Sequence, residues 1–203
     1  MVTISFEKQK KDERYNLYLD GEFFSGIEPD IIVKYSLKNG QEFDKDKIVN
    51  IVLESESFNA FNKALKYISK SMKTQGEMEK YLLSKGFNAD VVKIAIDKLI
   101  EYKYIDDEKY IETYVQFYKN ECGKQKIKQA LFSKKLDEEL IEKYLSYSEE
   151  ENLEKICQLI KKYSKNKDLD YNEKIKIKRR LFSKGYSVEI INKAFNNLGD
   201  YDD

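Results

Sequence analysis

The chain has 203 residues, and its 37 basic and 37 acidic side chains give a formal net charge of zero. Hydrophobic residues make up 41%, enough for a buried core, while 36% charged residues with only 8 Gly and 1 Pro favour an elongated helical protein over a large α/β enzyme. No long apolar run or leader pattern is present, so we expect a cytoplasmic protein with no membrane span.

The N-terminal region, residues 1–54, differs in pattern from the rest. Residues Tyr15–Phe24 form two apolar segments around Asp20-Gly21, which predicts a β-hairpin because an Asp-Gly pair suits the tight turn between strands. The apolar run Ile31–Tyr35 fits either a short helix or a strand, and we favour the helix. From about Asp44 the apolar spacing becomes helical and stays so to the end of the chain.

One stretch occurs three times in the helical part, starting at Leu82, Leu131 and Leu181, so the copies are 49 and 50 residues apart. A repeat of this period predicts stacked helical units that share a core. Each unit contains three helices by apolar spacing. The expected boundaries are 55–103 for repeat 1, 104–148 for repeat 2 and 149–203 for repeat 3, which ends in an acidic tail.

Within each copy, a turn joins the end of one helix to the start of the next. Gly86 and Gly185 follow a helix end, where a left-handed residue caps the helix, whereas Lys135 stands at this place in the middle copy. We therefore expect that middle turn to be built differently. The next helix of each copy begins with a capping side chain. These caps are Asn88, Asp137 and Ser187.

Few residues suit catalysis. The absence of His excludes Ser-His-Asp and Cys-His catalysis and every His-ligated metal site, and no phosphate-binding glycine loop is present. The cluster Asp106-Asp107-Glu108 could be a carboxylate metal site, but acids at a helix start are ordinarily capping residues, which we favour. Cys122 and Cys157 lack metal-ligand spacing and are expected to be reduced. We expect no enzyme activity, metal or cofactor.

Aromatic residues cluster between 102 and 118, a composition that could suit base stacking. Tyr110, Tyr114 and Phe117 follow helical spacing, so we expect them to be a core stripe instead.

Charge is unevenly distributed, with an acidic stretch from Asp137 to Glu154 and a basic one from Lys161 to Lys184. Equivalent positions of repeats 2 and 3 are basic, whereas repeat 1 has Gln75 and Glu79 there. A solvated helix face and a surface that docks an anionic partner both explain this pattern. The candidate partner-binding residues are Lys124, Lys128, Lys174, Lys178, Arg179 and Arg180.

Four segments, in this order and spacing, resemble the RecX family of regulators that bind and restrain RecA recombinase. They are Ala64–Ile68, Glu77–Phe87, Tyr104–Tyr110 and Gly123–Leu131. The hairpin at Asp20–Phe23 resembles the extension of longer family members. Where the family usually has Arg after its first helix, this chain has Lys70-Ser71-Met72-Lys73, so any contact of that Arg is not carried over.

The resemblance implies a mainly α fold, with a tandem array of three three-helix repeats forming an elongated crescent after the β-hairpin region. It implies a monomer that binds the RecA filament on single-stranded DNA and blocks filament growth, ATP hydrolysis and strand exchange, in DNA recombination, repair and the SOS response. The alternative is a helical-repeat protein that binds nucleic acid directly through the same basic face.

Overall fold

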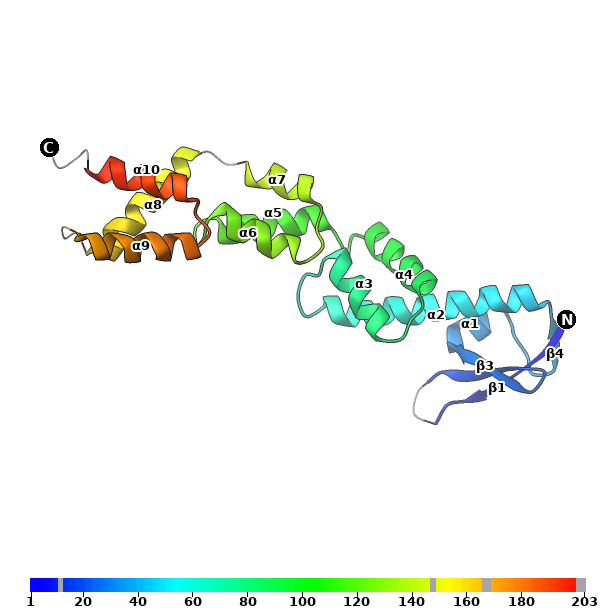
Figure 1. The fold of residues 1–203 in the computed structure, drawn as a ribbon. Helices are drawn as coiled ribbons and strands as arrows, with labels where there is room; N and C mark the ends of the chain where they lie inside the picture. Colours follow the sequence, from blue (N-terminus) through cyan, green and yellow to red (C-terminus); the bar gives the residue numbers. More distant parts are fainter. Residues whose placement is uncertain (11–12, 147–148, 166–168, 200–203) are drawn as a thin grey trace. The chain divides into compact units, whose positions relative to one another are not determined.

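A computed structural model describes residues 1–10, 13–146, 149–165 and 169–199 (Figure 1). The acidic tail from Asp200 and residues 166–168 lie outside these ranges. The chain divides into two compact units, Met1–Asp106 and Asp107–Asp203. The buried hydrophobic residues form two clusters in each unit.

The first unit begins with a four-stranded antiparallel sheet of strand order β3-β2-β1-β4. The strands are β1 (Val2–Lys8), β2 (Tyr15–Leu19), β3 (Glu22–Ile27) and β4 (Gln41–Phe43). The predicted hairpin is confirmed as β2–β3, and its two turn residues, Asp20 and Gly21, have φ of 49° and 85°. Positive φ at both central residues is what the favoured two-residue hairpin turn requires. The short strand β4 was not predicted.

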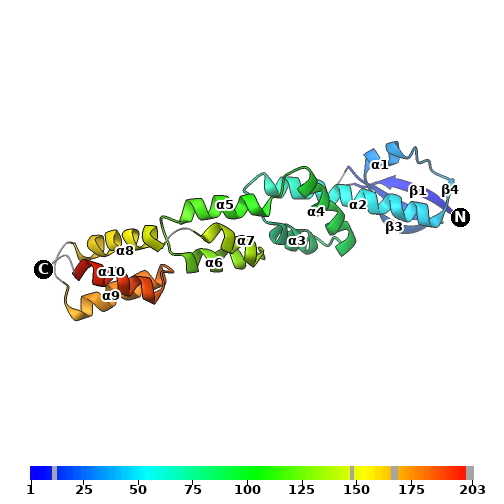
Figure 2. The ribbon, with the colours of Figure 1, turned by 90° about the horizontal axis from the view of Figure 1, so that it is seen from above.

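Two helices cover this sheet: α1 (Pro29–Lys34), which confirms the predicted short helix, and α2 (Lys45–Ile68). Figure 2 shows α2 running along the sheet. The N-cap of α2 is Asp44, whose side chain accepts hydrogen bonds from the amides of Asp46 and Lys47.

Helix α2 is 24 residues long and contributes buried side chains to two hydrophobic clusters. Ile48 in its first half belongs to the cluster that includes Ile4 and Leu17 of the sheet. Ala60 and Ala64 in its second half belong to the cluster of repeat 1. The expected boundary between residues 54 and 55 therefore falls inside one continuous helix.

Three-helix groups follow one another along the rest of the chain, which confirms the mainly α fold. Their helices after α2 are α3 (Gln75–Ser84), α4 (Ala89–Glu101), α5 (Asp107–Tyr118), α6 (Lys124–Phe132), α7 (Glu138–Leu145), α8 (Glu149–Ser164), α9 (Tyr171–Ser183) and α10 (Val188–Gly199). The repeated leucine of each copy is fully buried in its own core, at Leu82, Leu131 and Leu181. None of the helices in the described ranges combines the length and apolar composition that crossing a membrane requires.

The turn between the second and third helix of each repeat is built in the same way, which corrects the expectation for Lys135. Gly86, Lys135 and Gly185 all have left-handed φ, at 86°, 61° and 88°. In each copy the amide of this residue donates to the carbonyl oxygen three residues earlier, at 2.8–3.0 Å. Lys135 therefore adopts the left-handed conformation of the other two copies, although this conformation favours glycine. The three predicted N-caps, Asn88, Asp137 and Ser187, are confirmed by their hydrogen bonds.

The expected aromatic core stripe of α5 is wrong in one position. Phe117 is 67% exposed, whereas Ile111 and Val115 are the buried residues of this helix. Tyr110 and Tyr114 are half-buried beside them, with their rings stacked at 6.2 Å. The buried stripe is thus shifted by one residue, and the tyrosines flank it.

Candidate partner-binding surface

The six candidate basic residues lie on two helices of the second unit. Lys124 and Lys128 belong to α6, and the other four belong to α9. Lys124 is the first residue of α6 and follows its N-cap, Gly123. Lys124 and Lys128 of repeat 2 and their counterparts Lys174 and Lys178 of repeat 3 therefore lie on the second helix of their repeats.

The C-terminal end of α9 meets the N-terminal end of α6. The amide of Gly123 donates to the carbonyl oxygen of Lys184 at 2.8 Å, and the amide of Gln125 donates to that of Gly185 at 3.3 Å. The Lys184 ammonium also donates to the carbonyl oxygen of Glu121 at 2.9 Å. These bonds use amides and carbonyls that helix ends leave unpaired, and they join the positive end of one helix dipole to the negative end of the other.

This junction depends on glycine. A Cβ atom at Gly123 would lie 2.2 Å from the carbonyl oxygen of Gly185, which is far inside van der Waals contact. A Cβ atom at Gly185 would lie 2.5 Å from the Cβ of Lys126. Because both backbones approach this closely, the C-terminal end of α9 is held against the N-terminal end of α6.

Lys128 is already paired with two acids. Its ammonium lies 2.8 Å from Oε1 of Glu138 and 2.5 Å from Oε1 of Glu142, both on α7. The hydrogen bond to Glu138, followed by that to Glu142, raises the pKa of Lys128 above its ordinary value. The two carboxylates compensate its charge, so Lys128 joins α6 to α7 rather than standing as an isolated cation.

Lys178 has the equivalent position in repeat 3. Its ammonium donates to Oδ1 of Asn192 at 2.8 Å and lies 5.2 Å from the centre of the Phe195 ring. Asn192 follows Glu142 by the same 50 residues that separate Lys178 from Lys128. In both repeats a lysine of the second helix contacts the third helix. Its partner in repeat 3 is the neutral amide of Asn192, whereas in repeat 2 it is the carboxylate of Glu142.

The remaining basic residues of α9 are more available. Lys174 and Arg179 are exposed, and the structure of the described residues records no side-chain ion pair for either. Arg180 is also exposed, but its guanidinium lies 3.9 Å from the centre of the Tyr163 ring, a cation–π contact that orients it. Lys176, which the sequence did not single out, is exposed on the same helix.

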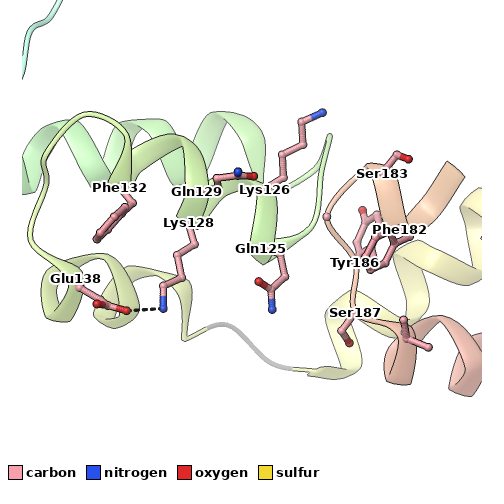
Figure 3. A pocket seen from close by; sticks show the side chains of 12 residues that line it. Gln125, Lys126, Lys128, Gln129, Phe132, Glu138, Phe182, Ser183, Tyr186 and Ser187 are labelled. Atoms are coloured by element: carbon pink, nitrogen blue, oxygen red, sulfur yellow. Dashed lines mark ion pairs between the residues drawn. The ribbon is translucent and has the colours of Figure 1, made fainter. Parts of the chain in front are cut away.

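A cleft of about 760 Å³ lies beside the junction, between α6 and the turn that joins α9 to α10 (Figure 3). Phe132 and Phe182 line it, and they are 59% and 61% exposed. Sequence reasoning missed both residues, although each directly follows a repeated leucine. That position lies outside the core stripe and is nevertheless apolar in every copy, since repeat 1 has Leu83 there.

The acidic cluster at the start of α5 has a structural role. Oε1 of Glu108 accepts hydrogen bonds from the Lys143 ammonium at 2.7 Å and from the Tyr144 hydroxyl at 2.8 Å. The bond from Lys143, with a smaller contribution from Tyr144, lowers the pKa of the Glu108 carboxyl. Glu108 thereby joins α5 to α7. Among the described residues, no group of three or more acidic or Cys side chains is placed to hold a metal ion.

Both cysteines are free thiols and half-buried. Burial raises the pKa of Cys122 and of Cys157, which keeps both in the protonated, unreactive form at neutral pH.

A small β-sheet region followed by three-helix repeats is the architecture of a helical-repeat protein. Residues 3–44 match the family model "Regulatory protein RecX N-terminal domain". Residues 60–99 match "RecX, first three-helix domain", and residues 149–195 match "RecX, third three-helix domain".

Individual relatives agree over almost the whole chain. The chain is 36% identical over 200 residues to the "Regulatory protein RecX" of Clostridium perfringens (strain SM101 / Type A), covering 96% of this chain and 94% of that one. It is 31% identical over 202 residues to that of Bacillus subtilis (strain 168), covering 97% and 76%. This chain belongs to the RecX family of regulatory proteins, as its sequence indicated.

Solved structures give the same result. A crystal structure of a regulatory protein RecX superposes with a TM-score of 0.69 at 26% identity, covering 97% of this chain and 100% of that one. The crystal structure of RecX from Lactobacillus salivarius gives a TM-score of 0.64 at 32% identity, covering 71% and 97%.

Proposed function

We propose that this protein is a negative regulator of RecA recombinase. It binds the RecA filament on single-stranded DNA and blocks filament growth, ATP hydrolysis and strand exchange. It acts as a cytoplasmic monomer in the control of DNA recombination, repair and the SOS response. The protein carries out no chemistry of its own, and its effect comes from occupying the filament.

The observation that carries this proposal is the similarity to regulatory proteins RecX over 96% of the chain. Repeated helical units also suit the proposed partner, because a filament offers the same surface at regular intervals and a solenoid offers its own surface in the same way. A regulator with several weak contacts to successive protomers gains avidity from their linkage.

We assign the contact to the basic surface of α6 and α9, formed by Lys124, Lys128, Lys174, Lys178, Arg179 and Arg180. Within it the residues have different roles. Exposed Lys174 and Arg179 provide charge toward the filament. Lys128 and Lys178 set the positions of α6 and α9, because each is bonded to the third helix of its repeat.

Direct binding tests the proposal. RecA filaments are assembled on single-stranded DNA with a non-hydrolysable ATP analogue, and the fluorescently labelled protein is titrated with them while its anisotropy is recorded. A saturable rise that needs both RecA and DNA supports the proposal. An unchanged anisotropy, with a far-ultraviolet circular dichroism spectrum typical of helices, contradicts it.

A second function, direct binding of single-stranded nucleic acid, is favoured by the exposed Tyr171 beside the cationic residues of α9. Its side chain is 77% exposed, as a base-stacking aromatic would be. Salt distinguishes the two functions, since a phosphate binder loses DNA affinity steeply as salt rises even when RecA is absent.

A further inference from the structure

Large apolar side chains are exposed at one register of all three repeats. Leu83, Phe132 and Phe182 are 46%, 59% and 61% exposed. Each occupies the position directly after a leucine that is fully buried. The buried leucine supplies the core contact, so the exposed neighbour is not needed for packing. Aromatic side chains left on a surface in this way are typical of interaction sites.

In the second unit two of these side chains flank one cleft. Figure 3 shows Phe132 on one side and Phe182 with Tyr186 on the other. Val188, 57% exposed, adds a third apolar side chain to the lining. The volume of about 760 Å³ is large enough for a short peptide segment with an inserted side chain.

The polar part of the lining suits a peptide. Most of it is neutral and can both donate and accept hydrogen bonds, as peptide groups require. The neutral residues are Gln125, Gln129, Ser183 and Ser187. The lining also contains the Glu138 carboxylate, paired with Lys128. The neutral donors and acceptors of the lining therefore suit the backbone of a peptide segment.

The charges at the rim indicate the sign of the occupant. Lys126, on α6, is exposed at the cleft. Arg179 precedes Phe182 by three residues on α9, which places the two on the same side of the helix. Lys128 is paired with two acids, Glu138 and Glu142, so the positive charge at the rim comes from Lys126 and Arg179. A segment with acidic residues next to an apolar one complements this rim.

We propose that the cleft between α6 and the α9–α10 turn docks a segment of a RecA protomer in which an apolar side chain has acidic neighbours. This proposal rests on the proposed function, because RecA is its partner only there. The apolar side chain enters between Phe132 and Phe182, and the acidic neighbours face Lys126 and Arg179. The junction at Gly123 and Gly185 fixes the spacing of the two aromatic rings.

The test compares three full-length variants with the parent protein in co-sedimentation with RecA filaments on single-stranded DNA. The variant Phe132→Ser/Phe182→Ser removes both rings, and Phe132→Leu/Phe182→Leu keeps apolar side chains as Leu83 does in repeat 1. Phe117→Ser is the matched control, since Phe117 is an equally exposed phenylalanine of the same unit outside the cleft lining. Circular dichroism verifies the helix content of each variant.

We expect the double Ser variant to lose about tenfold or more in filament affinity, because aromatic contacts dominate interface energies. The double Leu variant keeps apolar side chains in the cleft, and Phe117 lies outside it. Both variants should therefore bind filaments with an affinity within about threefold of the parent. Equal binding by the double Ser variant, with the parent binding well, overturns the cleft proposal and leaves the proposed function standing. Absence of binding by the parent protein itself overturns both.

A second assay separates nucleic acid from protein as the occupant. The anisotropy of fluorescent oligo(dT) is measured with the parent and the double Ser variant in the absence of RecA. Equal DNA affinity of the two proteins supports a protein segment in the cleft. A selective loss of oligo(dT) affinity in the variant makes the cleft a base-stacking site and overturns the proposal.

Discussion

The amide of Gly123 donates a hydrogen bond of 2.8 Å to the carbonyl oxygen of Lys184, joining repeat 2 to repeat 3 through their backbones. The bond connects the start of α6 to the end of α9, and a Cβ atom at residue 123 or 185 would lie 2.2 or 2.5 Å from the facing segment. The basic surface and the cleft both include residues on each side of this contact, so its geometry determines how they are arranged.

The variant Gly123→Ala tests this junction. Residue 123 has φ −77°, so alanine is not strained there, and its effect comes from the 2.2 Å approach to the Gly185 carbonyl oxygen. We expect a loss of about 1–3 kcal/mol, typical of overpacking, and faster hydrogen exchange at residues 123 and 125. The control is Gly26→Ala, whose Cβ would lie 3.0 Å from the guanidinium carbon of Arg14, a milder approach and to a side chain rather than to backbone. Unchanged exchange in Gly123→Ala contradicts the described junction.

The left-handed turn at Lys135 predicts a stabilising substitution. A lysine at φ 61° is strained relative to glycine, while glycine costs more backbone entropy on folding. The first effect is the larger, so Lys135→Gly should raise the free energy of unfolding by up to about 1 kcal/mol. Lys135→Ala keeps the strain and is the comparison. Urea unfolding measures both, and a less stable Gly variant would contradict the left-handed geometry.

Glu108 predicts a pH dependence of stability. Its pKa is lower in the folded protein, so its contribution is present above the ordinary pKa of 4.5 and is lost as pH falls through the folded value. Glu108→Gln should therefore melt at a lower temperature than the parent at pH 7, and the difference should shrink below pH 4.5. Glu139→Gln, on α7, is the control. A constant difference across this range would argue against the bonds from Lys143 and Tyr144.

Basic residues of the surface should contribute unequally to binding. Lys174→Ala/Arg179→Ala should weaken filament binding about tenfold and flatten its salt dependence, because both cations are exposed. Lys128→Ala should change affinity less, since Glu138 and Glu142 already compensate that charge. Affinities at several salt concentrations measure both effects. A larger loss for Lys128→Ala would contradict the assigned roles.

Charge reversal across the end of α9 is the stronger form of this test. The triple variant Lys178→Glu/Arg179→Glu/Arg180→Glu should abolish inhibition of RecA while the protein remains helical. Inhibition that persists in this variant would exclude α9 from the contact.

Residues that are close together in the sequence were sufficient to predict much of the fold. The Asp20-Gly21 turn, the capping residues Asn88 and Asp137, and the repeated leucines each depend on neighbours in the chain, and all are confirmed. The expected repeat boundaries and the crescent curvature stay predictions. The turn at Lys135 departs from its residue preference because contacts of the whole repeat hold the backbone.

The surface was harder to predict, because it depends on which side chains meet in space. Charge counting gave Lys128 the same weight as Arg179, but only the structure places Glu138 and Glu142 against Lys128. The stripe of α5 was misplaced by one residue, since Ile111 and Val115 take the buried side and Phe117 is exposed. The assignment of all six basic residues to the contact remains a prediction.

Single-stranded-DNA-dependent ATP hydrolysis by RecA, titrated with this protein, tests the central claim most directly. We predict suppression at ratios well below one regulator per RecA protomer, because a bound molecule that stops filament growth affects every protomer that would have joined. Hydrolysis that stays unchanged up to equimolar protein, with the protein folded and helical, would contradict the regulator function and favour direct nucleic-acid binding.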